Sequence, residues 1–413
     1  MILNCEKYKE YVQTANKPIA FVLNLSENGL GVIRSLGRRS IPVIGLDPNP
    51  WQIGLFSKYC KGMVCPDPES DEEEYIEFLL KIGELLRNKG VLIPSADIEL
   101  RTILNHKKEL ERYYLFPIAD SDVANLLANK RLFYEIVENL GFPCPKTFFP
   151  HNKSDLQEIC NKIKFPCIIK PIFSTKFNRD FGVKVFVADT LDDLILSFDK
   201  AVSNGLEVLI QEIIPGNDSD MYLVSGYFDR FSEPLGIFTF KRIRQYPLGF
   251  GNGALCLSIW RPEIADLCTS FLKLIKYHGL VDAELKKDPR DNKFKFIEIN
   301  PRTGLQHMLS ARCGIDLPYL AYRDTIGEKP AKITSQTEGI KWLHMFNDIR
   351  SAFDNMRLGR LSFLEYLDSL RGEKEYAIFA LDDLLPFIMH ILNKSYYITE
   401  FLIIYLINVI RSY

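Results

Sequence analysis

Two apolar segments joined by the turn DPRDN constrain this chain most, because both carry acids in a strand-like context. The first segment reads GLVDAELKK (279–287) and the second reads FKFIEIN (294–300). Side chains alternate across a strand, so Asp282 and Glu284 share one face, as do Glu298 and Asn300. The turn predicts an antiparallel hairpin, in which one acid of the first strand lies opposite or diagonal to Glu298.

Two explanations account for acids that face each other across a hairpin. Like charges at that separation destabilise a sheet unless a cation lies between them. Oxygen ligands from two carboxylates and an amide suit magnesium, which keeps waters and bridges to substrate phosphates. The structural alternative is that a carboxylate pairs with a nearby lysine, such as Lys286 or Lys295. Spacing alone leaves both explanations open.

Composition narrows the class of protein. A chain of 413 residues that is 47% hydrophobic has enough apolar sequence for two or three domains. Its net charge of −2 does not indicate a surface that binds polyanions, so we expect no nucleic-acid partner. The start MILNCEKYKE lacks the basic and apolar regions of a secretory signal, and nine cysteines without a C-x-x-C motif indicate reduced thiols. We therefore expect a cytoplasmic protein.

The first third of the chain has an α/β pattern. Apolar runs at residues 19–25 and 41–46, and a third that ends in VLIPSAD, alternate with helical segments such as 72–89. This alternation predicts a doubly wound parallel sheet. SENGLG follows the first strand and Asp47 follows the second, which is the order of a dinucleotide fingerprint without its G-x-G-x-x-G spacing. A plain βαβ unit with a glycine turn is favoured, and a nicotinamide site is the alternative.

Three later segments carry polar residues suited to a nucleotide. A helical pattern runs from near Asp120 to Gly141 and contains Lys130, and Lys170 ends the apolar strand CIIKP. A lysine at the end of a buried strand is a typical phosphate contact, and the alternative is a surface lysine with a buried stem. The strand VLIQEIIPGND can offer its backbone to a base edge and Asp218 to a ribose, although many strands end in Pro-Gly. Between these strands, STKFNRDFG is expected to be a polar loop.

In this order, the segments resemble the ATP-grasp superfamily over roughly residues 15–330, with FIEINPRTG as the most specific piece. The stretch VLIPSADIEL…YYLFPIADSDVANLLANK further resembles the carboxylate–amine ligase branch. The resemblance implies an α/β protein with an ATP-grasp fold, an N-terminal Rossmann-like (pre-ATP-grasp) parallel-sheet domain and a C-terminal extension. The expected division is residues 1–120 for the N-terminal domain, 121–205 and 206–330 for the two ATP-grasp subdomains, and 331–413 for the C-terminal region.

The resemblance also assigns roles to residues, and implies ATP with Mg²⁺ or Mn²⁺ as cofactors. The phosphates of ATP would contact Lys130 and Lys170. Adenine would lie against the hinge, and the ribose against Asp218; the hinge residues are Gln211, Glu212, Ile213 and Ile214. The metal would be held by Glu284, Glu298 and Asn300, with Glu284 preferred over Asp282 because the family places its first metal acid there. Arg302 would steady the transferred phosphoryl group.

A basic strand end adds candidates for the acid substrate. Lys241, Arg242 and Arg244 precede the glycine-rich loop at residues 249–253. A regular strand sends Arg242 and Arg244 to one face and Lys241 to the other. Charges at a strand end are usually solvated. The functional hypothesis is that Lys241 or Arg244 joins Arg302 in holding a carboxylate, which a guanidinium can bind through two hydrogen bonds.

The function implied is an ADP-forming ligase, which activates a small carboxylate as an acyl phosphate and joins it to an amine. The alternatives are a bicarbonate-activating carboxylase or carbamoyl-phosphate-like enzyme, and a non-catalytic ATP-binding module. The segment at residues 173–182 is poorer in small residues than the family's phosphate-covering loop, which leaves lid closure and substrate choice open.

The apolar end of the chain, YYITEFLIIYLINVIRSY, allows two interpretations. Only ten residues separate Glu400 from Arg411, fewer than the roughly 20 that a spanning helix needs. The segment at residues 398–413 is therefore expected to be a helix that docks on the protein body or on a second subunit of a homodimer. The alternative is a helix that lies on a membrane surface.

Overall fold

The computed structural model describes residues 6–394, except for the side chains of residues 6, 7, 174 and 175. The chain divides into two compact units. The first consists of Met1–Pro117, Thr325–Glu328 and Tyr376–Tyr413, and the second of Ile118–Asp324 and Lys329–Glu375. The four-part division expected from the sequence stays a prediction. The terminal helix expected at residues 398–413 lies outside the described residues.

The first unit contains the predicted parallel sheet. Its strand order is β3-β2-β1-β4-β5, and every neighbouring pair is parallel. In chain order the strands are β1 (Ala20–Leu23), β2 (Val43–Asp47), β3 (Lys61–Val64), β4 (Gly90–Pro94) and β5 (Tyr114–Leu115). The helices of this region are α1 (Glu6–Thr14), α2 (Glu27–Gly37), η1 (Ile53–Phe56), α3 (Glu72–Gly83), α4 (Asp97–Asn105) and α5 (Lys107–Leu110). Buried apolar side chains fill strands β1, β2 and β4, as a sheet covered on both faces requires.

The stretch SENGLG is not the glycine turn that its composition indicated. Helix α2 begins at Glu27, so most of this stretch forms the first turn of the helix. Gly29 is required by a close approach, because a Cβ atom at this position would lie 2.0 Å from the carbonyl oxygen of Asn24. Glycine therefore lets α2 pack tightly against the end of β1, which is a structural role.

The C-terminal part of the chain returns to the first unit. The carboxylate of Asp383 accepts hydrogen bonds from Nε of Arg34 at 2.9 Å, from Oγ of Ser57 at 2.8 Å and from the backbone N–H of Lys58 at 2.9 Å. Arg34 and Asp383 are both almost fully buried. These bonds tie the segment after β16 to α2 and η1. Among the described residues, no helix is long and apolar enough to cross a bilayer.

The second unit begins with two helices where the sequence indicated one. α6 (Ser121–Ala128) and α7 (Lys130–Asn139) are separated by Asn129, whose backbone leaves the helical region at φ −86° and ψ 109°. The side chain of Asn129 accepts from the N–H groups of Arg131 and Leu132, as an N-cap does. The prediction of a continuous helix is therefore wrong, and the break places Lys130 at the first position of α7.

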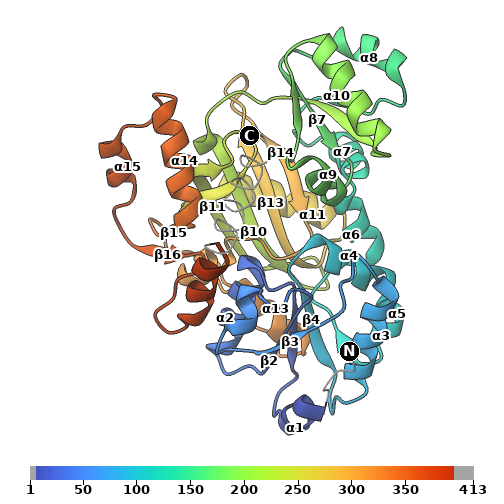
Figure 1. Ribbon diagram of the computed structural model, residues 1–413, viewed down its shortest axis with the longest axis vertical. Helices are drawn as coiled ribbons and strands as arrows, with labels where there is room; N and C mark the ends of the chain where they lie inside the picture. The colour runs from blue at the N-terminus through green and yellow to red at the C-terminus, as the bar shows by residue number, and fades with distance from the viewer. Residues whose placement is uncertain (1–5, 395–413) are drawn as a thin grey trace, which may run out of the picture. The chain divides into compact units, whose positions relative to one another are not determined.

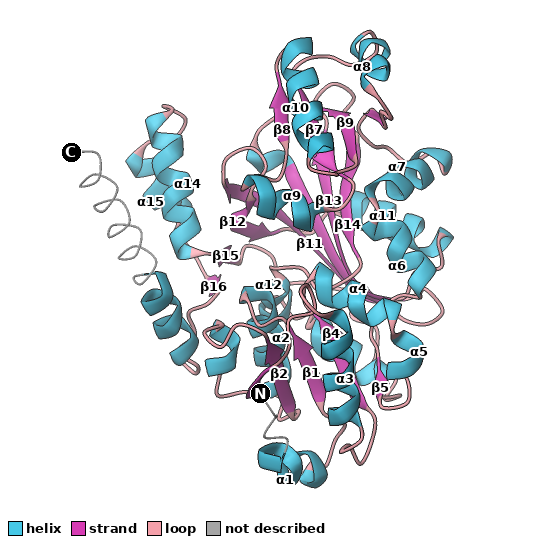
Figure 2. Cartoon of the chain, turned by 45° about the vertical axis from the view of Figure 1, so that its right-hand side comes forward, coloured by secondary structure: helices cyan, strands magenta, loops and turns pink. Residues whose placement is uncertain are grey.

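A four-stranded antiparallel sheet follows, in the order β6-β9-β7-β8. Its strands are β6 (Thr147–Phe148), β7 (Cys167–Pro171), β8 (Phe186–Ala188) and β9 (Val208–Glu212). Figure 2 shows this sheet with helices α8 (Lys153–Cys160), α9 (Ser174–Phe181) and α10 (Leu191–Ser203) around it. Apolar side chains from all three helices and from β7, β8 and β9 form one core.

Helix α9 replaces the polar loop that was expected at residues 174–182. Phe177 and Phe181 are four residues apart and pack against each other and against Phe186, with ring centroids 4.8–5.0 Å apart. Gly182 ends the helix in the left-handed conformation, at φ 67°. The prediction was wrong because the polar residues conceal an aromatic pair at helical spacing, which this core buries.

The second sheet of this unit has seven strands in the order β14-β13-β10-β11-β12-β15-β16. The strands are β10 (Met221–Phe228), β11 (Pro234–Tyr246), β12 (Asn252–Ser258), β13 (Gly279–Lys287), β14 (Phe294–Asn300), β15 (Lys341–Leu343) and β16 (Lys374–Tyr376). Figure 1 shows its long central strands side by side. The remaining elements are η2 (Asp218–Asp220), α11 (Pro262–Leu274), α12 (His307–Arg312), α13 (Leu317–Thr325), α14 (Met345–Arg357) and α15 (Phe363–Ser369).

Candidate active site

The hairpin of β13 and β14 brings the predicted acids together. Glu284 lies directly opposite Glu298, and Asp282 lies directly opposite Asn300. A register shift after Glu284 marks an irregularity in the ladder at this point. The prediction that an acid of the first strand faces Glu298 is confirmed, and the acid directly opposite is Glu284.

Each of these two carboxylates has a cation from a distant part of the chain. Nζ of Lys130, on α7, lies 3.1 Å from Oε1 of Glu298. Arg242, on β11, forms an ion pair with Glu284 through Nη2. Neither partner is one of the neighbouring lysines considered from the sequence. One of those, Lys295, instead lies 2.5 Å from Asp288.

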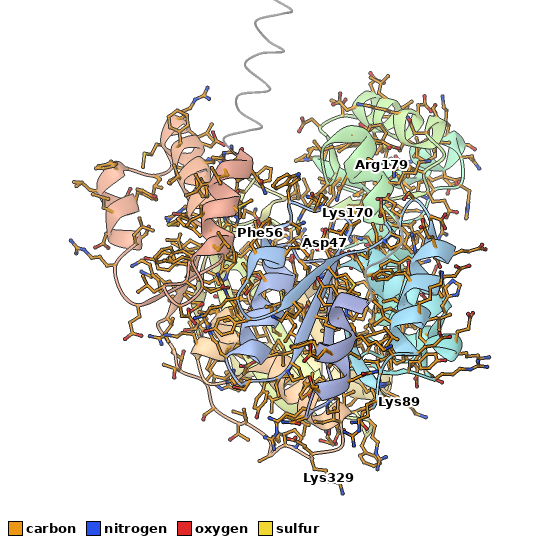
Figure 3. The ribbon with its side chains drawn as sticks, turned by 60° about the horizontal axis from the view of Figure 1, so that its bottom comes forward. Asp47, Phe56, Lys89, Lys170, Arg179 and Lys329 are labelled. Atoms are coloured by element: carbon orange, nitrogen blue, oxygen red, sulfur yellow. The ribbon has the colours of Figure 1, made fainter. Side chains whose placement is uncertain are left out.

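The acids line a cleft between the two sheets of the second unit. All seven predicted nucleotide residues line it too, from α7, β7, η2 and the strand β9 with the two residues that follow it: Lys130, Lys170, Gln211, Glu212, Ile213, Ile214 and Asp218. Figure 3 labels Lys170, at the end of β7. Apolar side chains complete the wall and suit a flat base, namely Ile168, Val185, Met221, Phe250 and Ile297. The fold therefore gathers segments that are almost 170 residues apart in the sequence into one cleft.

Positive charge is concentrated around Glu298. Burial would raise the pKa of this carboxyl, but the charges of Lys130 and Lys170 outweigh burial and hold the pKa at about 2. Burial lowers the pKa of Lys170 to about 8, against the opposing charge of Glu298. Nζ of Lys170 donates to Oε1 of Gln211 at 3.0 Å, which fixes the ammonium group at the end of its strand. This part of the cleft therefore carries cations that are suited to binding an anion.

The hinge strand β9 divides its side chains between two sides. Gln211 is buried, and its amide donates to Oγ1 of Thr147 at 2.8 Å. The carboxylate of Glu212 instead accepts from the backbone N–H of Lys146 at 2.9 Å and from Nη1 of Arg290 at 2.8 Å. The carboxylate of Glu212 is thus held by Arg290 and by a backbone N–H, so the residue can serve a base best through its backbone.

A hydrogen-bonded chain runs from the acid pair to the expected ribose position. Nη1 of Arg242 donates to Oε1 of Gln245 at 3.1 Å, and Nε2 of Gln245 donates to Oδ1 of Asp218 at 2.8 Å. Burial raises the pKa of Asp218, while the hydrogen bond from Gln245 acts in the opposite direction. Nε of Arg242 is buried and has no hydrogen-bond partner among the described residues. Arg242 therefore links the two ends of the cleft and retains an unused donor.

A bulge in β11 separates the basic residues that a regular strand would align. Arg242 pairs with Cys256 and Arg244 pairs with Leu255, so neighbours on β12 face the two arginines. The expectation that Arg242 and Arg244 share a face is therefore wrong, because a bulge inserts an extra residue and reverses the alternation. Arg242 faces the cleft. Lys241 and Arg244 lie outside the cleft lining in the described part of the chain.

Arg244 has partners away from the cleft. Its Nε lies 2.7 Å from Oδ1 of Asp348, on α14, and its Nη1 donates to Oγ of Ser369 at 2.7 Å. The side chains of Arg244 and Asp348 are both almost completely buried. These contacts support a packing role, and they do not support the predicted contact with a substrate.

The remaining predicted residues lie beside the cleft. Asn300 follows Glu298 on the same face of β14 and pairs with Asp282 across the hairpin. Nη1 of Arg302 donates to the carbonyl of Thr303 at 3.1 Å. Burial raises the pKa of Asp282 to about 6, and its carboxylate accepts from Oγ of Ser225 at 2.5 Å. Asn300, Arg302 and Asp282 are not among the described residues that line the cleft.

The structure adds two cations that were not among the predicted site residues. Arg242 was noted only for its place on a strand, and Lys184, just before β8, was not singled out. Nζ of Lys184 donates to Oδ1 of Asn252 at 2.5 Å, and burial lowers the pKa of this lysine. The sequence signal for Lys184 is the alternation of VKVFVA, in which a lysine interrupts an apolar strand.

The carboxylates of the cleft supply oxygen ligands suited to magnesium. No group of three or more His, Cys, Asp and Glu side chains surrounds a single position among the residues that the structure describes. Glu284 and Glu298 nevertheless supply hard oxygen atoms from opposite strands, with lysines beside them for phosphates. This arrangement fits Mg²⁺, which is typically held by one or two carboxylates together with waters and phosphate oxygens.

Comparison with known proteins agrees with this geometry. No protein-family model matches the chain. D-aspartate ligase of Enterococcus faecium (strain Aus0004) is 27% identical over an alignment of 291 residues, and the match covers 67% of this chain and 68% of the ligase. The biotin carboxylase of Campylobacter jejuni in its ATP-analogue complex superposes with a TM-score of 0.63 at 16% identity, over 78% of this chain and 74% of its own. The L-amino acid ligase of Bacillus licheniformis gives a TM-score of 0.58 at 14% identity, over 76% and 75%.

These solved structures share the arrangement of the chain and establish its ATP-grasp fold. Together with the sequence relative, they agree with the resemblance to the ATP-grasp superfamily and to its carboxylate–amine ligase branch. The sequence relative and the L-amino acid ligase are both ligases, the class of enzyme that the resemblance predicted.

Proposed function

We propose that this chain phosphorylates the carboxylate of an amino acid with ATP and joins the acyl phosphate to an amine, releasing ADP and phosphate. The observation that most directly supports this proposal is that Glu284 and Glu298 face each other in a cleft that is also lined by Lys130, Lys170 and Lys184. Two acids and three ammonium groups suit a metal-bound triphosphate. The amino-acid class is supported by the likeness of the chain to a D-aspartate ligase and to an L-amino acid ligase.

The chemical steps balance without a further reactant. A carboxylate oxygen attacks the γ-phosphorus, and the bond to the bridging β–γ oxygen breaks to leave ADP. The amine nitrogen then attacks the acyl carbon, the carbon–oxygen bond to phosphate breaks, and the amine loses a proton to water. Bound Mg²⁺ would neutralise charge on the β- and γ-phosphates.

The chain's own residues supply binding and position in this proposal. Lys130, Lys170 and Lys184 hold phosphate oxygens, since their ammonium groups meet at one end of the cleft. The backbone from Gln211 to Ile214 receives the base, and Asp218 receives the ribose. Glu284, Glu298 and Asn300 would hold Mg²⁺, and Mn²⁺ has the same preference for oxygen ligands. Arg302 and Arg242 are the cations proposed to meet the carboxylate and the transferred phosphoryl group.

The test is a screen of amino acids in pairs for phosphate release. The proposal predicts phosphate release from MgATP that requires both an acid and an amine, with an equal amount of condensed product detected by mass spectrometry. Phosphate release driven by bicarbonate would instead show a carboxylase or carbamoyl-phosphate-like reaction. Tight MgATP binding without any turnover would identify a binding module. The homodimer and the membrane-surface contact of residues 398–413 remain proposals, for which sedimentation and vesicle binding of the full chain are the assays.

A further inference from the structure

A second cavity lies next to the hinge residue Glu212, and the rest of its lining is separate from that of the nucleotide cleft. It has a volume of about 310 Å³ and is entirely within the second unit. Its lining is Lys146, Lys162, Ile163, Lys164, Glu212, Arg290, Asp291 and Lys295. Glu212 is the one residue that it shares with the nucleotide cleft. The proposed ligase reaction uses none of the cations around this cavity.

Two cations that line this cavity, Arg290 and Lys295, pair with the same buried carboxylate. Asp288 is fully buried and lies 2.6 Å from Nη2 of Arg290 and 2.5 Å from Nζ of Lys295. Nη1 of Arg290 also reaches the carboxylate of Glu212 at 2.8 Å. Lys295 has a second, longer contact of 3.5 Å with Asp291. The acids at this site are therefore already engaged with Arg290 and Lys295, and these two cations are fixed in position.

Three further lysines give the cavity an excess of positive charge. Lys146, Lys162 and Lys164 have no carboxylate partner within salt-bridge distance in the described part of the chain. Ile163 lies between two of them and is buried in the core of the four-stranded sheet, which anchors this loop. Ammonium groups gathered around one cavity repel each other, and an anion that binds between them relieves the repulsion.

We propose that this cavity binds a small anion that carries phosphate groups. Five cationic side chains line it, against the acids Glu212 and Asp291 of the lining and Asp288, which pairs with Arg290 and Lys295. Lysine is suited to phosphate as a point charge, and Arg290 adds planar N–H donors to the same wall. The volume far exceeds the roughly 30 Å³ of one water molecule, so a multi-atom ligand fits.

The experiment is calorimetric titration of the full chain with inorganic pyrophosphate in magnesium-free buffer, with the nucleotide cleft saturated by a non-hydrolysable ATP analogue. We expect saturable binding that weakens by about tenfold or more in the double variant Lys162→Ala and Lys164→Ala, because two charge-assisted contacts are lost. The matched control is Lys81→Ala with Lys153→Ala, which removes the same charge from exposed surface pairs elsewhere. The control should bind like the unmodified chain.

Three results would overturn the proposal. The first is no binding by the unmodified chain, and the second is equal weakening in both double variants. The third is binding that weakens in proportion when the concentration of the ATP analogue is doubled, because pyrophosphate would then occupy the nucleotide cleft. Each of these leaves the proposed ligase activity untouched, since that activity is measured by product formation.

Discussion

Replacing Glu298 with glutamine separates the metal role of this residue from a structural one. The change keeps the size of the side chain and removes one negative charge beside Lys130, whose Nζ lies 3.1 Å away. Two unit charges 5 Å apart interact by roughly 3 kcal/mol at an effective dielectric constant of 20. The Glu298 side chain is 36% exposed, so solvent screening reduces this value to about 1–2 kcal/mol.

The two consequences of Glu298→Gln have opposite signs. ATP is an anion, and its affinity without metal should rise by about 5- to 30-fold because a repelling carboxylate is gone. Turnover with Mg²⁺ should fall by about 100-fold or more, because one metal ligand is lost at the centre of charge development. Calorimetry in the presence of a chelator measures the first quantity, and steady-state phosphate release with saturating Mg²⁺ measures the second.

Asp282→Asn is the matched control. This acid lies on the same face of β13, two residues before Glu284, but it is buried, accepts a hydrogen bond from Ser225 and lies outside the cleft lining among the described residues. Both measurements should stay near the values of the unmodified chain, with thermal unfolding used to confirm the fold. Near-normal turnover in Glu298→Gln, or weaker metal-free ATP binding, would refute the reasoning.

Three further experiments test the remaining structure. Burial raises the pKa of Glu99 to about 7, so this carboxyl is neutral in the folded chain below about pH 7. The free energy of unfolding should therefore fall by about 3 kcal/mol as pH rises from the usual carboxyl pKa to about 7. Glu99→Gln should lack this loss, so the stability difference between variant and parent, from denaturant titrations at pH 4.5 and pH 8, should grow by that amount; an unchanged difference would contradict it. Asp383→Ala should lower stability by about 3 kcal/mol or more, because it removes the carboxylate partner of the buried Arg34 guanidinium. Asp382 is more exposed, so Asp382→Ala should cost under about 1 kcal/mol. Equal losses of stability in thermal melts would argue against a stabilising role for the buried Arg34–Asp383 pair. Arg244→Ala should destabilise the fold by about 3–5 kcal/mol, because it leaves the buried Asp348 without its partner, and the KM for the acid substrate should not change. A raised KM in a stably folded variant would instead support the contact with the substrate that the sequence suggested.

The sequence predicted those parts of the site that depend on local pattern. Alternation and the DPRDN turn were enough to place an acid of β13 opposite Glu298. The sequence also indicated the hinge strand and the strand-end Lys170, because each belongs to a short apolar run that ends at a polar residue. These features depend on neighbours within a few residues, and the structure contains them where the sequence placed them.

The errors have specific physical causes. A side-chain cap at Asn129 divided a helical pattern that looked continuous, and two phenylalanines at helical spacing turned a polar stretch into α9. A bulge reversed the alternation in β11, so the arginine in the cleft is Arg242. Its pairing with Glu284 joins residues 42 positions apart and depends on strand order, which periodicity cannot supply.

The most direct test of the central claim is the fate of oxygen during turnover. The carboxylate substrate found in the amino-acid screen should be labelled with ¹⁸O, and the released phosphate analysed by mass spectrometry. An acyl phosphate requires one labelled oxygen in each phosphate, because the carboxylate oxygen that attacks the γ-phosphorus leaves with it. Unlabelled phosphate accompanied by amide product would contradict the proposed mechanism.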